Sequence, residues 1–303
     1  MTAGTSRPPQ PSRPSQPERP RRPSRPSRTK RNLALVGVAL LVAWAALSIE
    51  VQVDRLVDLP GGLARIFDRM FIRDGVDWTY LGHSLAAMVE SIQIAWVGTI
   101  IGAILSLPLG FFGAKNVSSG LVSNIVRQVL NVIRAFPELV LVLVIFIPIA
   151  GLGPVAGALA IGLHSVGTLG KLTAEVVEGI DPGPVEAARA AGGRSLQVQR
   201  WGVLPQVLPD IVAFWLYRFE INIRAAAILG VVGAGGIGTV IQQTIVFQRF
   251  PRAGMAILVV IVATLVVDVV SGWVRRRIIE GAGARRLTGD EIEQPEVVDA
   301  APA

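Results

Sequence analysis

The sequence predicts an all-α protein that crosses a lipid bilayer about six times. Of the 303 residues, 51% are hydrophobic and only 17% are charged, and the charges crowd into a few segments between long apolar runs. Runs such as Ser91–Phe112 and Leu139–Leu163 leave no polar face for water, whereas a soluble domain alternates apolar and polar residues. The formal charge of +7 does not indicate nucleic-acid binding, because nine of the 29 Lys and Arg residues lie in the first 31 positions.

The first 32 residues form a Pro- and Arg-rich stretch that cannot bury apolar surface, and we expect a disordered tail there. The first predicted span, Leu33–Ile49, follows. A signal peptide is the alternative, because a basic region precedes this apolar run. Its 17 residues are long for the apolar part of a signal, so an uncleaved helix is favoured. Residues 33–83 therefore hold the first span and an extracytoplasmic loop.

Five further spans follow in order, each placed by apolar length and flanking helix breakers. Each is long enough to cross about 30 Å of hydrocarbon at about 1.5 Å per residue. A tight turn at 151–154, which reads Gly-Leu-Gly-Pro, separates the third span from the fourth. The core is then 84–277, and residues 278–303 form a C-terminal tail. The predicted spans are Ser84–Phe112, Val129–Ala150, Pro154–Gly170, Leu208–Leu229 and Ala253–Trp273.

The distribution of basic residues predicts the orientation of these spans. Twenty Lys and Arg residues lie on the side that holds both termini, the loop with Lys115 and Arg127, and the loop Lys171–Gln206; six lie on the other side. Basic residues are enriched in cytoplasmic loops. Both termini and the 180–206 loop are therefore predicted to be cytoplasmic.

The 180–206 loop has the signals of two short helices. Pro182 and Pro184 suit a helix start, Val185–Ala191 favours helix, and Gly192-Gly193 suits its end. A second short helix, Leu196–Trp201, should then run into Leu204-Pro205. We expect a compact helix-turn-helix lying along the cytoplasmic membrane surface.

Residues of this loop resemble a known motif. Glu186-Ala187-Ala188, then Gly192 after three residues, then Leu204-Pro205, look like the EAA loop of ABC-type importer permeases. The resemblance implies the type I importer permease fold. It also implies that the loop docks into a groove of a cytoplasmic ATPase and transmits nucleotide-driven closure to the helices. One position departs from the family pattern, because the usual Ile two positions before Leu204 is Gly202.

Three further stretches, Arg134–Glu138, Trp201–Pro209 and Tyr217–Gln243, are similar to the permease of phosphonate importers. This resemblance implies import of phosphonates, phosphite or phosphate across a bacterial inner membrane. It implies two ATP-binding subunits, an extracytoplasmic binding protein and a second permease copy in a homodimer or with a homologue. ATP and Mg²⁺ belong to the ATPase partner, so this chain needs no cofactor. A permease of another importer, such as a methionine-type one, is the alternative, because those permeases share the glycine-rich turn.

Charged and polar residues inside a predicted span are candidates for the substrate pathway, because charge in a bilayer is costly and usually faces protein or water. On a helix, Arg218 stacks with Asn222, and Glu220 with Arg224. Two interpretations of Arg224 stay open: a buried pair with Glu220 that fixes packing, or a guanidinium that binds an anion.

Two other predicted spans carry polar candidates. Arg134 and Glu138 repeat the four-residue spacing around Pro137, and a structural ion pair is favoured over substrate contact. His164 either bonds to a neighbouring helix, which is favoured, or touches an oxyanion. Asp268 is predicted to reach lipid headgroups or Arg275.

The glycines at 233–238 satisfy the GxGxxG spacing of dinucleotide sites, but no strand precedes them and a membrane span follows. Gly233, Gly235 and Gly236 are better explained as a helix break or gate. The sequence holds no Walker lysine motif, no cysteine and only two histidines, so we expect no catalytic residue and no metal site. A membrane-embedded enzyme and an ion-driven transporter remain the less favoured functions.

Overall fold

The structure is a computed structural model that describes residues 28–48 and 53–292, and every regular element in those residues is helical. Most of the predicted N-terminal tail, and residues 293–303, lie outside the described residues. The chain divides into two compact units, residues 1–61 and 62–303, which are described separately below.

The first unit contains the predicted first span. Helix α1, Arg28–Ser48, is apolar enough to cross a membrane and matches the predicted span to within a few residues. Helix α2, Val53–Phe67, starts in this unit and crosses its boundary; a π-helical segment η1, Asp68–Ile72, follows. Only a loop was predicted here, but Leu59, Leu63 and Ile66 recur at helical spacing and give α2 one apolar face.

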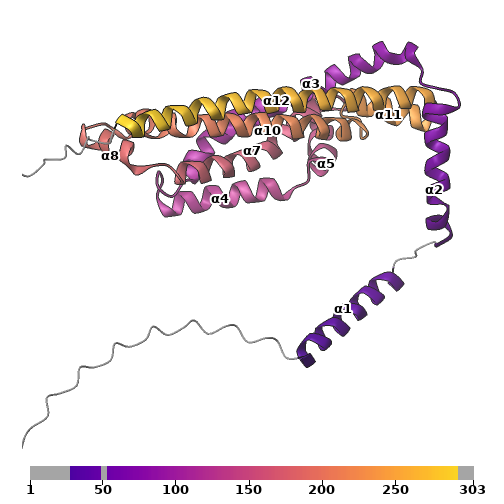
Figure 1. The fold of residues 1–303 in the computed structure, drawn as a ribbon, viewed down its shortest axis with the longest axis horizontal. Helices are drawn as coiled ribbons and strands as arrows, with labels where there is room; N and C mark the ends of the chain where they lie inside the picture. Colours follow the sequence, from indigo (N-terminus) through magenta and orange to yellow (C-terminus); the bar gives the residue numbers. More distant parts are fainter. Residues whose placement is uncertain (1–27, 49–52, 293–303) are drawn as a thin grey trace, which may run out of the picture. The chain divides into compact units, whose positions relative to one another are not determined.

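Four long helices run side by side in the second unit (Figure 1). Shorter helices lie at their ends and along α7. The long helices are α3 (Leu81–Gly113), α7 (Pro154–Glu178), α10 (Leu204–Gly230) and α12 (Phe250–Ile292); the shorter ones are η2 (Trp78–Tyr80), α4 (Gly120–Ala135), α5 (Glu138–Val140), η3 (Leu141–Phe146), α6 (Ile147–Ala150), α8 (Pro182–Ala190), α9 (Ser195–Val198), η4 (Gln199–Val203) and α11 (Gly236–Val246).

Glycines bring α3 and α7 into close contact. A Cβ atom at Gly98 would lie 2.7 Å from Ile161, and one at Gly110 would lie 2.5 Å from Thr173. Contacts therefore advance in the same direction along both helices, which means that α3 and α7 are parallel. Small residues at such interfaces let helices in a membrane pack closely, where water provides no driving force.

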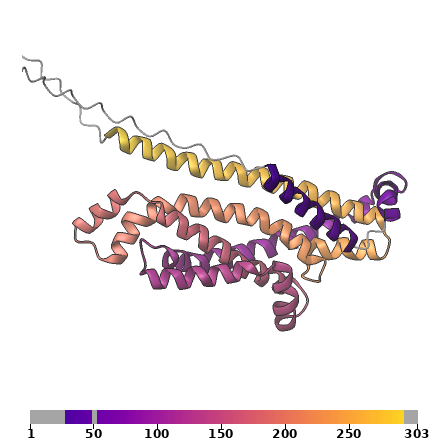
Figure 2. The same cartoon turned by 90° about the horizontal axis from the view of Figure 1, so that it is seen from below.

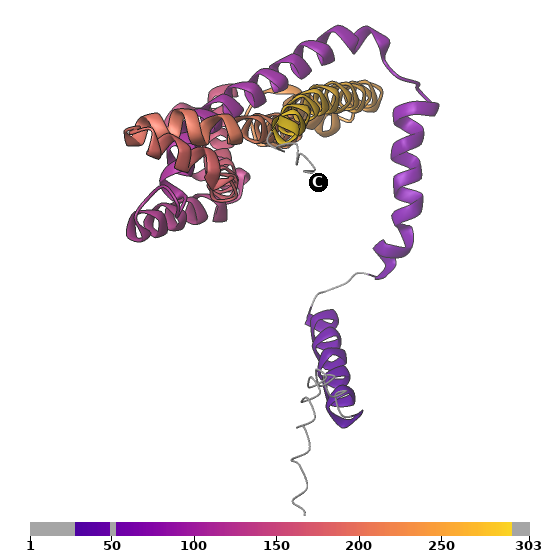
Figure 3. The ribbon, with the colours of Figure 1, turned by 60° about the vertical axis from the view of Figure 1, so that its left-hand side comes forward.

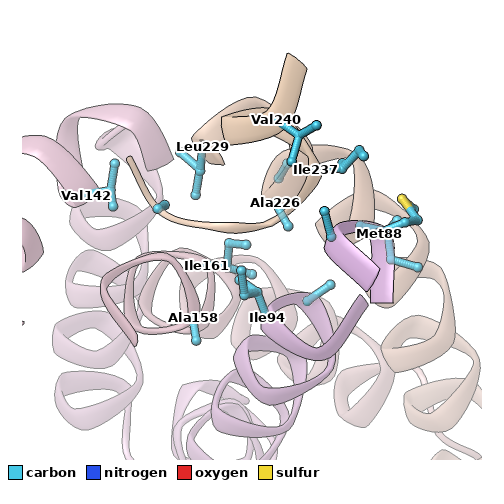
Figure 4. Close-up of a cluster of buried hydrophobic side chains, with 14 of the residues drawn as sticks. Met88, Ile94, Val142, Ala158, Ile161, Ala226, Leu229, Ile237 and Val240 are labelled. Atoms are coloured by element: carbon cyan, nitrogen blue, oxygen red, sulfur yellow. The ribbon is translucent and has the colours of Figure 1, made fainter. Parts of the chain in front are cut away.

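A hydrophobic core joins these helices near one end of the bundle (Figure 4). Its side chains come from α3, η3, α7, α10, α11 and α12, so it fixes the long helices against the short ones. The labelled members are Met88, Ile94, Val142, Ala158, Ile161, Ala226, Leu229, Ile237 and Val240.

The third predicted span is not one helix. Helix α4 ends at Ala135, and the segment Glu138–Ala150 starts at an angle of 78° to it (Figure 2). Pro137 has no N–H to continue the helix, and it restricts Phe136 to the extended backbone that the structure shows there. Because α4 already starts at Gly120, Arg127 lies inside a helix and not in the predicted loop.

Within residues 28–48 and 53–292, four helices are apolar and long enough to cross a membrane, or five if the bent pair counts as one span. The remaining predicted span, the fifth in order, corresponds to α10, which has 27 residues but carries Asp210, Arg218, Glu220 and Arg224. Its length corresponds to about 40 Å, enough to span. Helix α12 continues to Ile292, through most of the predicted C-terminal tail.

Candidate functional site

The loop at 180–206, which is predicted to couple the chain to an ATPase and is called the coupling loop below, folds as two short arms at one end of the bundle (Figures 1 and 3). Its first arm, α8, is capped by Asp181, whose side chain accepts a hydrogen bond from the Gly183 N–H at 2.9 Å. It ends in a Schellman motif: Gly192 N–H donates to Arg189 O, and Gly193 N–H donates to Ala188 O. Gly192 has φ +77°, a conformation that favours glycine.

The second arm, α9 and η4, continues directly into α10 at Leu204. Gln206 ties the start of α10 back to the start of α8. Its Oε1 accepts from Asp181 N–H at 3.1 Å, and its Nε2 donates to Asp181 O at 3.2 Å. Because both arms are bonded to the same long helix, a movement of the loop is passed to α10.

Gly202, the position that departs from the family pattern, lies at the contact between the two arms. It is buried, and a Cβ there would be 3.1 Å from Val185 Cα and 3.2 Å from Pro184 O. A larger residue would separate η4 from α8. The departure from Ile therefore has a packing reason in this chain.

One face of the loop is open and partly apolar. Glu186 and Ala187 are exposed, as are Leu196 at 78% and Trp201 at 70%. Exposed apolar groups of this size are typical of protein contact surfaces. On the other side of the arms, a cavity of about 650 Å³ opens against the turn between α3 and α4. The arms themselves are held by a second core: Ala114, Val177, Val185, Val198, Val203, Val207 and Ile211.

Arg218 is the centre of a polar network inside the bundle. It is 7% exposed, and its Nη2 lies 2.7 Å from Glu138 Oε1. Its Nε donates to Ser165 Oγ at 3.1 Å. The predicted pairing of Arg134 with Glu138 is wrong, because the break at Pro137 removes the i,i+4 geometry that the prediction assumed.

Asn222 connects three helices. Its Nδ2 is 2.9 Å from Thr99 Oγ1 on α3 and 3.1 Å from Ser165 Oγ on α7. Arg218 and Asn222 therefore share Ser165 as a partner. Thr99 and Ser165 were not predicted as part of this site. An uncharged hydroxyl in a glycine-rich apolar run does not indicate a polar contact until the helices are packed.

Two further charged residues of α10, Glu220 and Arg224, pair with α12. Glu220 Oε1 lies 3.0 Å from Arg275 Nη2, and Arg224 Nη1 lies 3.2 Å from Asp268 Oδ2. Of the two interpretations of Arg224, the pair with Glu220 is therefore wrong, and Asp268 pairs with Arg224 and not with the predicted Arg275. The antiparallel α12 places an opposite charge beside each side chain, which removes the need for a pair within α10.

His164 is held by the neighbouring broken helix. Its Nδ1 is 3.1 Å from Phe136 O, and its Nε2 is 3.5 Å from Glu138 Oε1. Arg134 is exposed and makes no ion pair within residues 28–48 and 53–292. Of the predicted pathway residues, Glu138, His164, Arg218 and Asn222 thus form one group, whereas Glu220 and Arg224 contact α12.

The glycine-rich segment is the turn between α10 and α11, at the end of the bundle away from α8 (Figure 1). Gly233, Gly235 and Gly236 have φ of +92°, +82° and +70°. A Cβ at Gly235 would be 2.7 Å from Glu90 Oε1, and the Ile237 N–H donates to Ser91 Oγ at 2.9 Å. Glu90 was also missed, although a lone acid in an apolar run was a visible signal.

Near the same end, Asp77 holds α12 to the segment before α3. Its carboxylate accepts from Arg252 Nε at 3.0 Å and from Thr79. The Thr79 hydroxyl, followed by Arg252, lowers the pKa of Asp77 below its ordinary value of 3.8. No group of three or more potential metal ligands occurs among the residues that the structure describes.

Known proteins resemble this chain in sequence and in fold. A family profile described as "Binding-protein-dependent transport system inner membrane component" matches residues 106–280. The chain is 41% identical over 194 residues to the Phosphate-import permease protein PhnE of Mycolicibacterium smegmatis, which covers 64% of this chain but only 36% of that relative. It is 39% identical over 190 residues to the Phosphite transport system permease protein PtxC of Stutzerimonas stutzeri, covering 62% and 69%.

Two solved structures share the fold. An inward-facing crystal form of the MetNI methionine ABC transporter aligns with a TM-score of 0.59 at 18% identity, over 67% of this chain and 99% of that chain. An amino acid ABC transporter solved with histidines aligns with a TM-score of 0.54 at 20% identity, with the same coverage. At such low identity, this likeness concerns the fold alone.

Proposed function

The chain belongs to the family of binding-protein-dependent transport system inner membrane components, and we propose that it is the permease subunit of an ABC importer for phosphonates, phosphite or phosphate. The family match confirms the resemblance to importer permeases that the sequence predicted. The proposal for an oxyanion is supported by the names of the relatives and by the buried guanidinium of Arg218. Guanidinium groups suit phosphate-type oxygens.

The orientation in the membrane follows from charge. With 20 Lys and Arg residues on one side of the six-span arrangement and six on the other, both termini and the α8–η4 loop face the cytoplasm. The turn between α10 and α11 then faces the extracytoplasmic side.

The partners of the permease follow from this arrangement. Two ATP-binding subunits dock on the exposed face of α8 and η4, one on each of two permease copies in a homodimer. An extracytoplasmic binding protein delivers the oxyanion at the opposite end. This chain binds no cofactor itself, and ATP and Mg²⁺ are held by the ATPase subunits.

Helix α10 is the mechanical link in this proposal. It begins at Leu204, where the coupling loop ends, and carries Arg218 and Asn222 in its middle. When the ATPase pair closes on ATP, the loop moves with it and shifts α10 against α7 and α5, where the polar network lies. The open side of the bundle then changes from cytoplasmic to extracytoplasmic.

The coupling loop provides the first test. In Gly192→Ala, a residue other than glycine must hold φ of +77°, at a strain of about 1–2 kcal/mol. We expect this variant and Glu186→Ala to retain ATPase activity while losing ATP-driven uptake of substrate in proteoliposomes.

Gly179→Ala is the matched control, because Gly179 ends α7 close to the loop without a positive φ, and its Cβ would make only ordinary contacts. If the double variant Glu186→Ala/Gly192→Ala shows normal stimulation of ATPase activity and normal uptake of substrate, the assignment of the loop is wrong.

A permease for another small solute is the second candidate, favoured by the shared fold with the MetNI methionine transporter. Titration of the partner binding protein with alkylphosphonate, phosphite, phosphate and methionine separates the two. An uncharged ligand or an amino acid ligand would remove the oxyanion assignment and leave the permease role intact.

A further inference from the structure

The Glu138 carboxylate occupies the position of an anion bound to Arg218. Glu138 Oε1 is 2.7 Å from Arg218 Nη2, and Arg218 is almost completely buried. A buried charge without a partner is strongly unfavourable, so Arg218 needs an anionic neighbour at all times. In the structure, the chain itself supplies that anion.

This ion pair is built differently from the two pairs that join α10 to α12. Glu138 lies on α5, which has only three residues between Pro137 and the π-helical η3, whereas Asp268 and Arg275 lie on one continuous helix. Irregular helical turns of this kind are frequent at functional sites. The Glu138 side chain is 23% exposed and that of Arg218 is 8% exposed, so an incoming ion reaches the pair from the carboxylate side.

Arg218 stays in place when the carboxylate is exchanged. Its Nε remains bonded to Ser165 Oγ, and the same hydroxyl is bonded to Asn222. His164 does not substitute for it. Its Nδ1 donates to Phe136 O, and its Nε2 lies 3.5 Å from Glu138 Oε1, against 2.7 Å for Arg218 Nη2. Arg218 is therefore the donor that holds Glu138.

We propose that Glu138 is a resident counter-anion that the transported oxyanion replaces at Arg218 during passage. The inference rests on the proposed import of phosphonates, phosphite or phosphate. An oxygen of such an anion accepts the same charge-assisted hydrogen bonds as a carboxylate. The guanidinium has one anionic partner before, during and after the exchange, so no proton needs to move.

The exchange also explains how a buried arginine serves a transport path without trapping the substrate. Competition from Glu138 weakens every oxyanion that binds to Arg218, and the returning carboxylate displaces it. Arg134 provides a second positive charge nearby, because its backbone packs on Gly167, about one helical turn from His164 on α7.

Glu138→Gln tests the proposal, since it keeps the shape of the side chain and removes the competing charge. The full importer complex is placed in nanodiscs without nucleotide and without binding protein, and retention of radiolabelled inorganic phosphate and methylphosphonate is measured by equilibrium dialysis. A charge at this distance shifts an equilibrium by about tenfold to a thousandfold. Removing the competing carboxylate should therefore raise the affinities for phosphate and for methylphosphonate by about that factor. Uptake in proteoliposomes should become slower, and Glu138→Asp should keep the weak binding of the natural chain.

Asp268→Asn is the matched control, because it also removes the carboxylate partner of an arginine on α10, here in the more exposed pair with Arg224. It should leave phosphate retention unchanged, and adding Arg218→Gln to Glu138→Gln should abolish the gain. If Glu138→Gln assembles poorly, phosphate added during purification should restore assembly in a saturable manner. The proposal is overturned if Asp268→Asn raises the affinity for phosphate as much as Glu138→Gln does. It is also overturned if Glu138→Gln shows neither a higher affinity for phosphate nor assembly that phosphate restores.

The two levels of inference fail differently. If the natural complex and its binding protein import none of the three oxyanions, the proposed function is wrong. If import is normal but Glu138→Gln binds phosphate no better than the natural chain, only the resident counter-anion is wrong.

Discussion

From the close contact at Gly202 we predict that larger side chains at this position weaken binding of the ATPase in proportion to their size. In Gly202→Ile, the Cβ meets the backbone of Val185 and Pro184 at 3.1 and 3.2 Å, and three more carbons enter a buried site. Backbone atoms cannot rotate away, so η4 must separate from α8. Overpacking of this kind destabilises by about 1–3 kcal/mol.

If this strain acts on the loop conformation that binds the ATPase, the affinity for the ATPase should fall by about 5- to 150-fold. Gly202→Ala should give a smaller loss, because the neighbours need to give by only a few tenths of an ångström. Binding of purified ATPase to the permease in nanodiscs measures the effect.

Gly272→Ile is the control, since a Cβ at Gly272 meets nothing within 4 Å. A Gly202→Ile permease that binds the ATPase as tightly as the natural chain would refute the packing argument. So would an equal loss in Gly272→Ile.

Two further predictions concern stability. Asn222→Leu leaves the Thr99 and Ser165 hydroxyls without their shared partner, and we expect a loss of about 1–3 kcal/mol, measured as a lower thermal unfolding midpoint; an unchanged midpoint would contradict the network. The lowered pKa of Asp77 means that its ionised form stabilises the fold above the ordinary pKa of 3.8, and that this contribution disappears as the pH falls through the lower folded-state pKa. Below about pH 4, the unfolding midpoint should therefore fall more steeply with decreasing pH for the natural chain than for Asp77→Asn, and parallel curves would contradict it.

Local features of the coupling loop were readable from the sequence because their causes lie within a few residues. The prolines at the start of α8 and the glycine pair at its end set backbone conformations by themselves. The long apolar runs likewise determined α1, α3, α7 and α12, since a backbone in lipid must satisfy its own hydrogen bonds. Helix α2 was also readable from its spacing but was passed over as a loop.

The ion pairs were not readable in this way. Sequence spacing suggested partners four residues apart, yet Arg218 pairs with Glu138, 80 positions away, and Glu220 pairs with Arg275, 55 positions away. A buried charge takes the partner that packing places beside it, and packing joins helices that are distant in the chain.

The sequence by itself determined that this is a polytopic helical protein and where the proposed coupling loop lies, because apolar length, glycines and prolines act locally. Only the tertiary structure decided that the third span bends at Pro137 and that Glu138 thereby reaches Arg218. It also decided that Gly202 is needed between the two arms of the loop. Those contacts depend on which helices lie against one another, which no local pattern specifies.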